Sequence, residues 1–407
     1  MILREKIAQE IRERGPIPFS RYMEMCLYDP QLGYYSRDVE RFGKAGDFYT
    51  SSDIHAVFGR LLARQFEEMW RVLGSPERIE LLELGPGRGL FARDVLDWSE
   101  KKFPEFFHAL HYSLFERSPT LRERLRSTLS RPFGSDKISL PESIEPFGFD
   151  GRAEIYRDSA PEVPVITFAN EFFDALPVEV VSTDGELQIG LKDVRFVETW
   201  APVSPEETGF LDRYSVQPEA GERIEVSLIA QRYISGLAAR LARGIFIAID
   251  YGYTREEQLA GRHRSTLMAF RQHSATANAY EAPGEQDITA HVNFTALAVA
   301  MERSGMHAQP LLTQSQFLMG IGEQNQFADA FEDCRLPQER AKVALQLKHL
   351  VTPAGIGESF HVLVGSKAVD VDQVKQCSGL SFGKEGVEGP QESGCKSRKN
   401  EPIANAE

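Results

Sequence analysis

The sequence predicts an α/β protein with a mostly parallel sheet covered by helices, and three observations lead to that prediction. Short apolar runs alternate along the 407 residues with segments of helical periodicity. Several of these runs end abruptly in an acid or an amide, and the first of them leads into a glycine-rich turn. Because parallel strands bring their carboxyl ends to one edge of a sheet, where ligands bind in such folds, we expect these polar residues to form a site.

Residues 1–52 are predicted to form an N-terminal cap that ends in a ligand-covering loop. Isoleucines at helical spacing predict a first helix within residues 1–14, and a second short helix extends to Leu27. A loop rich in glycine and aromatic residues follows, before a long helix that Gly74 ends. We expect this loop to fold over a ligand, and an ordinary connector is the alternative. The loop residues expected to contact the substrate or cofactor are Gly43, Gly46, Asp47, Phe48 and Thr50.

The most informative segment is residues 79–91, where a short apolar strand turns sharply into a helix. The turn reads Glu83-Leu-Gly-Pro-Gly-Arg-Gly89. Gly85 and Gly87 permit backbone angles and a close ligand approach that a Cβ would block, and Gly89 lets the helix start close to the strand. The first N–H groups of a helix have no partner within it, so they are available to a ligand. A tight turn that binds nothing is the alternative.

The glycine spacing distinguishes two classes of ligand. Dinucleotide-binding turns follow the pattern G-x-G-x-x-G, whereas this chain has E-x-G-x-G-x-G. A carboxylate two residues before the first glycine would repel a phosphate, but it suits a cationic ligand such as S-adenosylmethionine, which carries an ammonium and a sulfonium. The residues of this turn expected to bind the cofactor are Glu83, Gly85, Pro86, Gly87 and Gly89.

Two further acids are expected to contact the nucleoside part of that ligand. Glu116 ends the strand at residues 111–116, where it can accept hydrogen bonds from both ribose hydroxyls, and capping of the next helix is the alternative role. Residues 154–158 are the candidate third strand, and its terminal Asp158 is expected to face the adenine amino group.

The fourth strand, residues 163–171, changes from apolar to polar at its end and predicts the catalytic site. Asn170, Glu171 and Asp174 should face the transferable group in the crevice. Asn170 is expected to contact the cofactor as well. Two carboxylates three residues apart are costly there unless a positive group lies between them. A guanidinium or ammonium substrate would meet that need.

The remaining segments complete the predicted domain. The first part of this domain covers residues 53–177, a β-hairpin region is inserted over residues 178–222, and the domain resumes over residues 223–370. Within that second part we expect a helix at 223–243 and strands at 244–253 and 360–365. Asp287 and His291 could be functional, although a hydrogen-bonded structural pair is the preferred interpretation. Residues 371–407, rich in Gly, Ser, Lys, Glu and Gln, are predicted to be a disordered tail.

Composition excludes several classes of protein. A formal net charge of −14 argues against a nucleic-acid surface and favours a basic protein partner. The four cysteines are isolated, so we expect neither a metal site nor a disulfide framework, and a reducing compartment suits them. No apolar run reaches the ~18 residues of a membrane span. The charged N-terminus does not read as a signal peptide, so we expect a cytoplasmic protein.

Taken together, these blocks resemble the MidA family of class I S-adenosylmethionine-dependent methyltransferases, which includes a mitochondrial protein arginine methyltransferase acting in complex I assembly. The resemblance extends from residue 1 to about 367. It is carried, in order, by Pro16-Ile-Pro-Phe, Tyr28-Asp-Pro-Gln-Leu-Gly-Tyr-Tyr, Phe42-Gly-Lys-Ala-Gly-Asp-Phe-Tyr-Thr, the turn at 83–89, Ala169-Asn-Glu-Phe-Phe-Asp-Ala-Leu-Pro, Ile249-Asp-Tyr-Gly-Tyr and Gly284-Glu-Gln-Asp-Ile-Thr-Ala-His-Val. The bulky Arg88 departs from many relatives, which carry a small residue there.

The resemblance implies a Rossmann-like, seven-stranded methyltransferase sheet with S-adenosyl-L-methionine as cofactor. It implies a methionine-binding turn at residues 83–89, a ribose contact at Glu116 and a substrate-facing Asn170-Glu171. The implied activity is methylation of arginine in a protein, and a respiratory complex I-type subunit is the implied partner. A non-catalytic assembly factor that binds the cofactor and a small-molecule methyltransferase are the alternatives.

Overall fold

A mixed, mostly parallel sheet is the centre of the structure, a computed structural model that describes residues 2–37, 56–135, 137–140, 162–271, 274–276 and 278–387. Seven strands follow one another across this sheet, and the first five are mutually parallel. β17 is antiparallel to both of its neighbours. The order is β4 (Ile138–Ser139), β3 (Leu110–Phe115), β2 (Ile79–Leu84), β5 (Val165–Asn170), β10 (Gly244–Tyr253), β17 (Phe360–Lys367) and β15 (His307–Ala308), with β14 (Val292–Asn293) beside β10 and β16 (Leu312–Thr313) beside β17.

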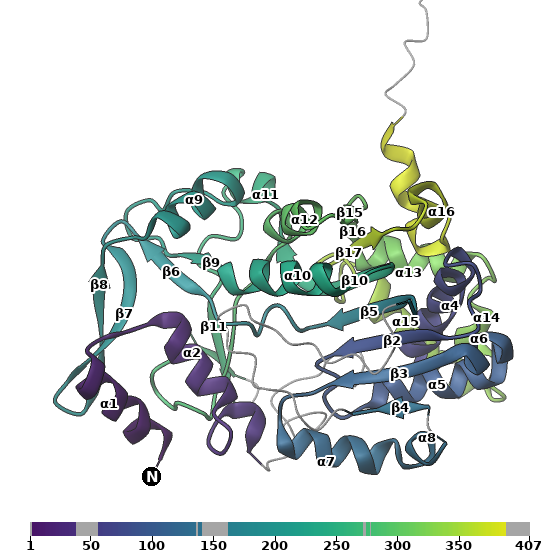
Figure 1. Ribbon diagram of the computed structural model, residues 1–407, viewed down its shortest axis with the longest axis horizontal. Helices are drawn as coiled ribbons and strands as arrows, with labels where there is room; N and C mark the ends of the chain where they lie inside the picture. Colours follow the sequence, from purple (N-terminus) through teal and green to yellow (C-terminus); the bar gives the residue numbers. More distant parts are fainter. Residues whose placement is uncertain are drawn as a thin grey trace, which may run out of the picture.

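The predicted α/β class is therefore confirmed, and the strand order places a ligand crevice. The chain order runs outward from β2 through β3 to β4 on one side, and through β5 to β10 on the other. The topological switch point thus lies between β2 and β5, and ligands of open α/β sheets bind outside the carboxyl ends of the strands at this point. Figure 1 shows the arrowheads of β2, β3 and β5 pointing toward the unit that contains α1 (Leu3–Arg14) and α2 (Phe19–Tyr28).

Helices cover both faces of the sheet because its central strands are apolar on both sides. Along β10, Ile245, Ile247 and Ile249 pack into one core, whereas Phe246 and Ala248 pack into the other. Helices α10 (Leu228–Arg240) and α12 (Phe294–Arg303) contribute to the core of the second face. The first face is covered by α4 (Ala56–Val72), α5 (Leu90–Lys102), α6 (Pro104–Ala109), α7 (Pro119–Thr128), α13 (Gln314–Glu323) and α15 (Pro337–Val351), with the short α8 (Ser130–Gly134) and α14 (Ala328–Phe331) nearby.

The N-terminal residues and the inserted strands pack around one shared core, and we call residues 2–37 and 178–226 the cap unit. Leu3, Ile7 and Tyr22 pack there against Val180 and Ile189. The unit contains an antiparallel sheet, larger than the hairpin that was predicted. Its strands are β1 (Ile17–Pro18), β7 (Gly185–Lys192), β6 (Glu179–Ser182) and β9 (Ile224–Val226), with β8 (Arg195–Ala201) on β7, and its helices are α1, α2, the 3₁₀ turn η1 (Tyr34–Ser36) and α9 (Pro205–Tyr214).

The prediction of a continuous helix over residues 223–243 is wrong at its start. Residues 224–226 form β9, which pairs with β6, and the helix α10 begins only at Leu228. Glu225 is buried and accepts hydrogen bonds from the backbone N–H groups of Thr266 and Leu267, so distant contacts override the local helical pattern. Beyond α10 lie α11 (Arg255–Leu259) and a small sheet of β11 (Met268–Arg271), β12 (Ser274–Thr276) and β13 (Asp287–Thr289).

The prediction of disorder from residue 371 is also wrong for the described part of the tail. Residues 371–387 contain α16 (Val371–Lys375) and η2 (Ser378–Val387). Two acceptors on α4 hold them: Glu68 Oε2 accepts from the Ser378 N–H at 2.7 Å and Gln65 Oε1 from the Gly379 N–H at 2.8 Å. Leu380 is buried in the core of the first face. This polar segment is ordered because its few apolar residues are buried and because α4 offers buried hydrogen-bond partners.

None of the helices in the described ranges has the length and apolar character of a membrane span.

Replacement of Leu380 tests whether this tail segment is part of the core. We expect Leu380→Ala to lower the free energy of unfolding by about 2–4 kcal/mol, because it removes a buried side chain and leaves a cavity. Leu345→Ala is the matched control, since Leu345 is 69% exposed on α15 and should change stability by less than about 0.5 kcal/mol. Denaturant unfolding measures both, and equal small effects would mean that the segment does not pack as described.

Candidate functional site

The glycine turn between β2 and α5 has the backbone conformation that its sequence predicts. Gly85, Gly87 and Gly89 have φ of +65°, +54° and +76°. A Cβ at Gly87 would meet no heavy atom within 4 Å among the described residues, so the turn leaves open space at its middle. A Cβ at Gly85 would lie 3.0 Å from the Phe172 ring, which brings the loop after β5 against the turn. The turn therefore offers backbone and open space to a ligand.

The structure gives a further reason for glycine at position 89. A Cβ at this position would lie 2.7 Å from Cδ2 of Leu125 and 3.1 Å from Cδ1 of Leu129. The glycine therefore allows close packing against α7 and not only against the strand. Gly89 is also the N-cap of α5, and its lack of a side chain means that no side-chain hydrogen bond caps the helix. The N-terminus of a 13-residue helix thus opens at the carboxyl edge of the sheet without a capping group.

Glu83 is buried directly before the turn, and in the ligand-free protein it holds a proton. Burial raises the pKa of Glu83, the hydrogen bond that Tyr112 Oη donates to Glu83 Oε2 at 2.8 Å opposes this rise, and the nearby charge of Glu116 adds to it, so that the pKa is about 8. A cationic ligand would favour the ionised form. The carboxyl group is therefore suited to a positive ligand, but it does not act as a fixed negative charge before that ligand arrives.

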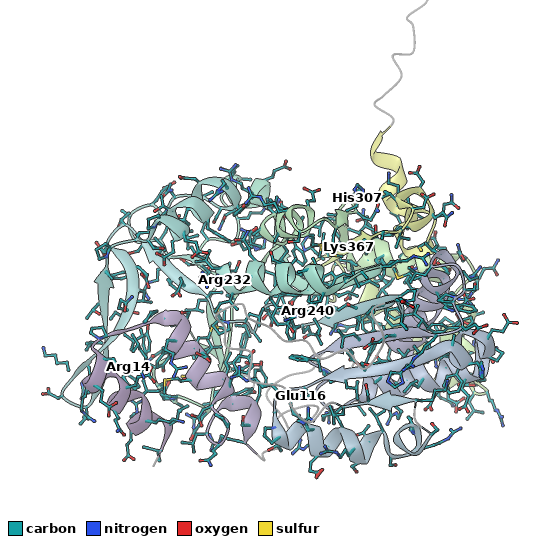
Figure 2. The ribbon with its side chains drawn as sticks, in the orientation of Figure 1. Arg14, Glu116, Arg232, Arg240, His307 and Lys367 are labelled. Atoms are coloured by element: carbon teal, nitrogen blue, oxygen red, sulfur yellow. The ribbon has the colours of Figure 1, made fainter. Side chains whose placement is uncertain are left out.

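Glu116 lies at the end of β3, next to the same turn, as predicted (Figure 2). The backbone N–H of Ser118 donates to Glu116 Oε1 at 2.8 Å, and the backbone N–H groups of Gly87 and Arg117 also hydrogen-bond the carboxylate. Burial nevertheless raises its pKa to about 7. Glu116 thus connects the glycine turn to the second strand, and this contact places an acid beside the open space at Gly87.

The described part of the predicted N-terminal cap closes over this edge of the sheet. The Tyr35 carbonyl accepts from Ser118 Oγ at 2.6 Å, and the Tyr35 hydroxyl donates to Asp287 Oδ1 at 2.9 Å. Tyr28 Oη donates to the Ala175 carbonyl at 2.8 Å. The cap is therefore attached to residues after β3, after β5 and in β13, on both sides of the switch point.

The last residue of β5 and the loop after it carry the three residues predicted to be catalytic, and an acid on the next strand holds this loop in place. Asp250 on β10 accepts from the backbone N–H groups of Phe172, Phe173 and Asp174 at 3.2, 2.9 and 3.3 Å. Burial raises the pKa of Asp250, and the neighbouring carboxyl groups of Asp174 and Glu171 raise it further. Sequence reasoning left Asp250 out of the site, although an acid ending the strand beside β5 was the signal that could have found it.

The predicted catalytic residues lie together at the carboxyl end of β5. Asn170 Nδ2 donates to Glu171 Oε1 at 3.1 Å, whereas Asn170 Oδ1 is buried with no hydrogen-bond partner among the described residues. Glu171 has a φ of +50°, which is an unfavourable conformation. The backbone N–H of Glu171 donates a hydrogen bond to the Ile249 carbonyl at 2.9 Å, and this bond helps to hold the conformation. Tyr251 Oη donates to Asp174 Oδ2 at 2.5 Å, and burial raises the pKa of Asp174 to about 6.

The structure also shows what Asp287 and His291 contact. Asp287 accepts from Tyr35 of the cap unit, as described above. His291 Nδ1 lies 3.2 Å from His263 Nδ1, and its ring packs edge-on against Tyr251. Burial, together with the neighbouring His263, lowers the pKa of His291 to about 4. Each residue thus has a partner of its own, and these contacts favour structural roles.

Two sets of predicted contacts fall outside the described residues. They are Asp158 and the loop residues Gly43, Gly46, Asp47, Phe48 and Thr50. The structure does bring together the remaining predicted positions, since the glycine turn, Glu116 and the loop after β5 meet at the switch point.

These residues fit S-adenosyl-L-methionine. A Cβ at Gly87 would meet no described heavy atom within 4 Å, so this side of the backbone is open to a ligand. Glu83 and Glu116 are carboxyl groups beside it, suited to an ammonium and to ribose hydroxyls, respectively. Asn170 Oδ1 is a buried acceptor that lacks a donor among the described residues, which a ligand N–H or O–H would satisfy.

Comparison with known proteins agrees with this fit. Residues 61–312 match the model of the family described as "Putative S-adenosyl-L-methionine-dependent methyltransferase". The chain is 32% identical over 383 residues to the protein arginine methyltransferase NDUFAF7 homolog, mitochondrial, of Drosophila melanogaster, covering 89% of this chain and 84% of that protein. It is 30% identical to the mitochondrial protein arginine methyltransferase NDUFAF7 of Mus musculus, covering 86% and 81%.

A solved structure shares the fold over nearly the whole chain. It is a Burkholderia thailandensis protein crystallised with S-adenosyl-homocysteine, with a TM-score of 0.75 and 27% identity, covering 92% of this chain and 94% of that one.

Replacement of Glu83 by Gln tests the protonated state of this buried group. A folded-state pKa of about 8 against an ordinary value of 4.5 means that the folded protein holds an extra proton between these pH values. The contribution of protonated Glu83 to the free energy of unfolding is therefore largest below pH 4.5, and it is lost as the pH rises toward 8. Without ligand, Glu83→Gln should be more stable than the parent by about 4–5 kcal/mol at pH 8.5 and by less than about 1 kcal/mol at pH 5.

The control for this measurement is Glu77→Gln, because Glu77 is exposed on the loop before the same strand. Denaturant unfolding at several pH values should show that the free energy of unfolding of this control depends on pH as it does in the parent. Titration calorimetry should show that Glu83→Gln weakens binding of S-adenosyl-homocysteine. A Gln variant with the parent's pH dependence would contradict the assigned protonation.

Proposed function

Because this chain belongs to the family of S-adenosyl-L-methionine-dependent methyltransferases that its residues 61–312 match, we propose that it methylates arginine side chains of a protein substrate. The resemblance to the MidA family and the predicted cofactor, S-adenosyl-L-methionine, are both confirmed by these comparisons. One observation supports the arginine substrate most directly: Glu171, Asp174 and Asp250 gather at the carboxyl end of β5. Such a group of acids favours a cationic acceptor.

The residues that would hold the cofactor lie on the other side of the switch point. The turn at residues 85–89 would receive it, with Glu83 toward its ammonium and Glu116 toward its ribose. When bound, the cofactor supplies a methyl group activated by a sulfonium. The protein's main task is then to align the acceptor nitrogen with that methyl group and to keep other acceptors away from it.

Glu171 is the residue that we assign to the guanidinium. Its carboxylate can accept paired N–H bonds and direct one nitrogen of the substrate toward the cofactor. A positive charge arriving nearby favours ionisation of Asp174, whose pKa of about 6 reflects its burial. Asp250 acts through the backbone, since its hydrogen bonds fix the loop that carries both acids. No strong base is required, because the nitrogen-bound proton becomes acidic as the new bond forms.

Similar proteins support this choice of substrate. The proteins from Drosophila melanogaster and Mus musculus are named as protein arginine methyltransferases, and each matches more than four fifths of this chain. A net charge of −14 also favours a basic partner. A subunit of a respiratory complex I is the partner that the family resemblance suggests. We further propose a reducing compartment such as the cytoplasm, which the unpaired Cys26, Cys334 and Cys377 favour.

Incubation with labelled cofactor would separate this proposal from its alternatives. The pure protein, methyl-labelled S-adenosyl-L-methionine and lysate from a strain lacking the gene should yield a labelled protein, whose label is released as methylarginine on acid hydrolysis. Label in a metabolite alone would indicate a small-molecule methyltransferase. An absence of transfer despite cofactor binding by calorimetry would indicate a non-catalytic assembly factor.

Replacement of Glu171 by Gln tests the catalytic assignment. We expect kcat/KM for a labelled protein substrate to fall about 10- to 100-fold, because a charged hydrogen bond to the guanidinium is lost. Binding of S-adenosyl-homocysteine should stay within about twofold of the parent, since the assigned contact is with the substrate.

Glu162→Gln is the matched control, because Glu162 is exposed just before the opposite end of β5. It should keep full activity. Unchanged methylation by Glu171→Gln, with normal binding of the cofactor product, would show that another group holds the acceptor.

A further inference from the structure

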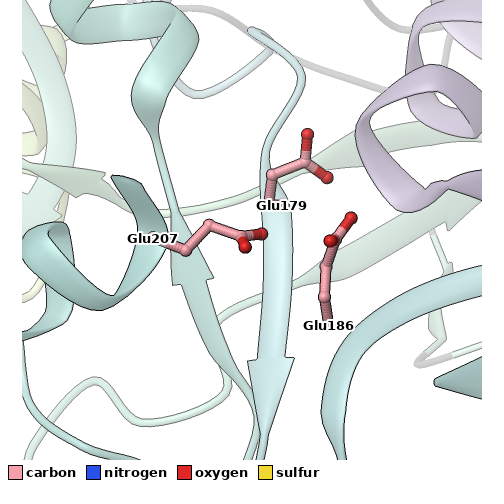
Figure 3. A group of neighbouring side chains, drawn as sticks. All are labelled: Glu179, Glu186 and Glu207. Atoms are coloured by element: carbon pink, nitrogen blue, oxygen red, sulfur yellow. The ribbon is translucent and has the colours of Figure 1, made fainter. Parts of the chain in front are cut away.

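A second acidic site lies in the cap unit, in a pocket that does not include the residues of the methyl-transfer site. The pocket has a volume of about 560 Å³ and lies between α2, β6, β7, α9 and α10. Three glutamates from different elements line it together (Figure 3). Glu179 is the first residue of β6, Glu186 lies on β7, and Glu207 comes from the first turn of α9.

The three carboxyl groups converge on one point. A carboxylate oxygen from each residue lies within 4.8 Å of those from the other two. Figure 3 shows the three carboxyl groups lying near one another, with the Glu207 side chain reaching toward Glu179. Burial, together with the neighbouring charges of Glu207 and Glu179, raises the pKa of Glu186 to about 7. Convergence of three acids is unfavourable in the free protein, so a compensating positive charge would be bound strongly.

Glu207 supplies an independent sign of a missing partner. The residue is only 2% exposed, and its Oε1 has no hydrogen-bond partner among the described residues. Its Oε2 is used for another purpose, since it accepts from the Ser204 N–H at 2.6 Å and caps α9. A buried carboxylate oxygen without a donor is costly, and a cation bound between Glu207 and the two neighbouring carboxyl groups would supply the missing partner.

The side-chain donors near the three glutamates either bind other acids or donate to only one oxygen of the cluster. Ser20 Oγ donates to Glu179 Oε1 at 2.5 Å, and Gln188 Nε2 donates to Glu186 at 2.8 Å. Arg232, which also lines the pocket, donates to Glu206 at 2.6 Å. Arg21 forms ion pairs with Glu10 and Glu24.

We propose that Glu179, Glu186 and Glu207 bind a hard divalent cation of the Mg²⁺, Mn²⁺ or Ca²⁺ class. Three oxygens within 4.8 Å of one another leave a central point no more than about 2.8 Å from each, close to the 2.0–2.6 Å of such metal–oxygen bonds. These cations prefer carboxylate oxygens and keep several waters, and the pocket volume provides room for them. This site would be independent of the methyl-transfer site.

A lysine or arginine side chain fits this cluster less well. Either brings a single positive charge to three carboxyl groups, whereas a divalent cation brings two. A guanidinium also binds as a planar fork that matches one carboxylate, which would leave the buried Glu207 oxygen without a direct partner. A compact ion can contact all three.

A bound ion would connect parts of the chain that are far apart in sequence. Glu179 is held by Ser20 of α2, and Glu207 belongs to α9. Pro177, which lines the same pocket, follows shortly after Asp174. Cation binding would therefore stabilise the cap unit and the end of the loop that carries the predicted catalytic acids.

Titration with Mn²⁺ tests this proposal without any measurement of methyl transfer. The full chain, stripped with chelator and held at pH 8, should bind one Mn²⁺, as seen by loss of the free-ion electron paramagnetic resonance signal. Glu207→Gln and Glu186→Gln should each weaken this binding at least about tenfold. Mn²⁺ should also raise the unfolding temperature of the parent but not of these variants.

Glu206→Gln is the matched control, because it removes one negative charge from the same pocket outside the cluster. It should keep the parent's affinity for Mn²⁺. Circular dichroism should show that each variant is folded. If Glu207→Gln misfolds, Glu186→Gln, which lies on a strand, still tests the proposal. The proposal would be overturned if the parent bound no stoichiometric Mn²⁺, or if Glu206→Gln lost as much affinity for Mn²⁺ as the cluster variants. It would also be overturned if an arginine-containing peptide occupied the pocket and Mn²⁺ did not.

Discussion

The carboxylate of Asp250 constrains the geometry on which the rest of the site depends. It follows the apolar run of β10 and accepts hydrogen bonds from three consecutive backbone N–H groups after β5. These bonds turn the chain immediately after Asn170, so that Glu171 and Asp174 stay at the sheet edge. The turn also brings the Phe172 ring against Gly85. A single buried side chain therefore relates the loop that carries the predicted catalytic acids to the turn that is predicted to receive the cofactor.

Around this anchor, the protein concentrates carboxyl groups that burial makes difficult to ionise. The pKa values of Glu83, Glu116 and Asp174 are raised to about 8, 7 and 6. Each shift costs stability in the ligand-free state at neutral or alkaline pH, because the folded chain must either hold a proton or bury a charge. A cationic cofactor and a cationic substrate would reduce this cost. Binding and ionisation are thus coupled, and the same burial that destabilises the free protein favours positively charged ligands.

The cap unit serves the site by its position. Tyr28 and Tyr35 hydrogen-bond residues from three separate parts of the chain along the sheet edge. The inserted strands share a core with α1 and α2, so the insertion supports the cap. The acid cluster of Glu179, Glu186 and Glu207 lies inside this same unit. Its contact with Ser20 of α2 places the proposed cation where it would reinforce the attachment of the cap.

The sequence alone determined the class of sheet, the glycine turn and the acids at the strand ends, because alternation of apolar runs and turn chemistry are local properties. Glu83, Gly87, Glu116 and Glu171 could therefore be assigned from their positions. Tertiary structure decided the rest. Residues 224–226 became a strand because β6 pairs with them, and residues 371–387 became ordered because Gln65 and Glu68 hold them. The anchoring by Asp250, the packing of Gly89 against α7 and the convergence of three glutamates all join residues distant in sequence. Such contacts depend on how elements pack, and no local pattern encodes them.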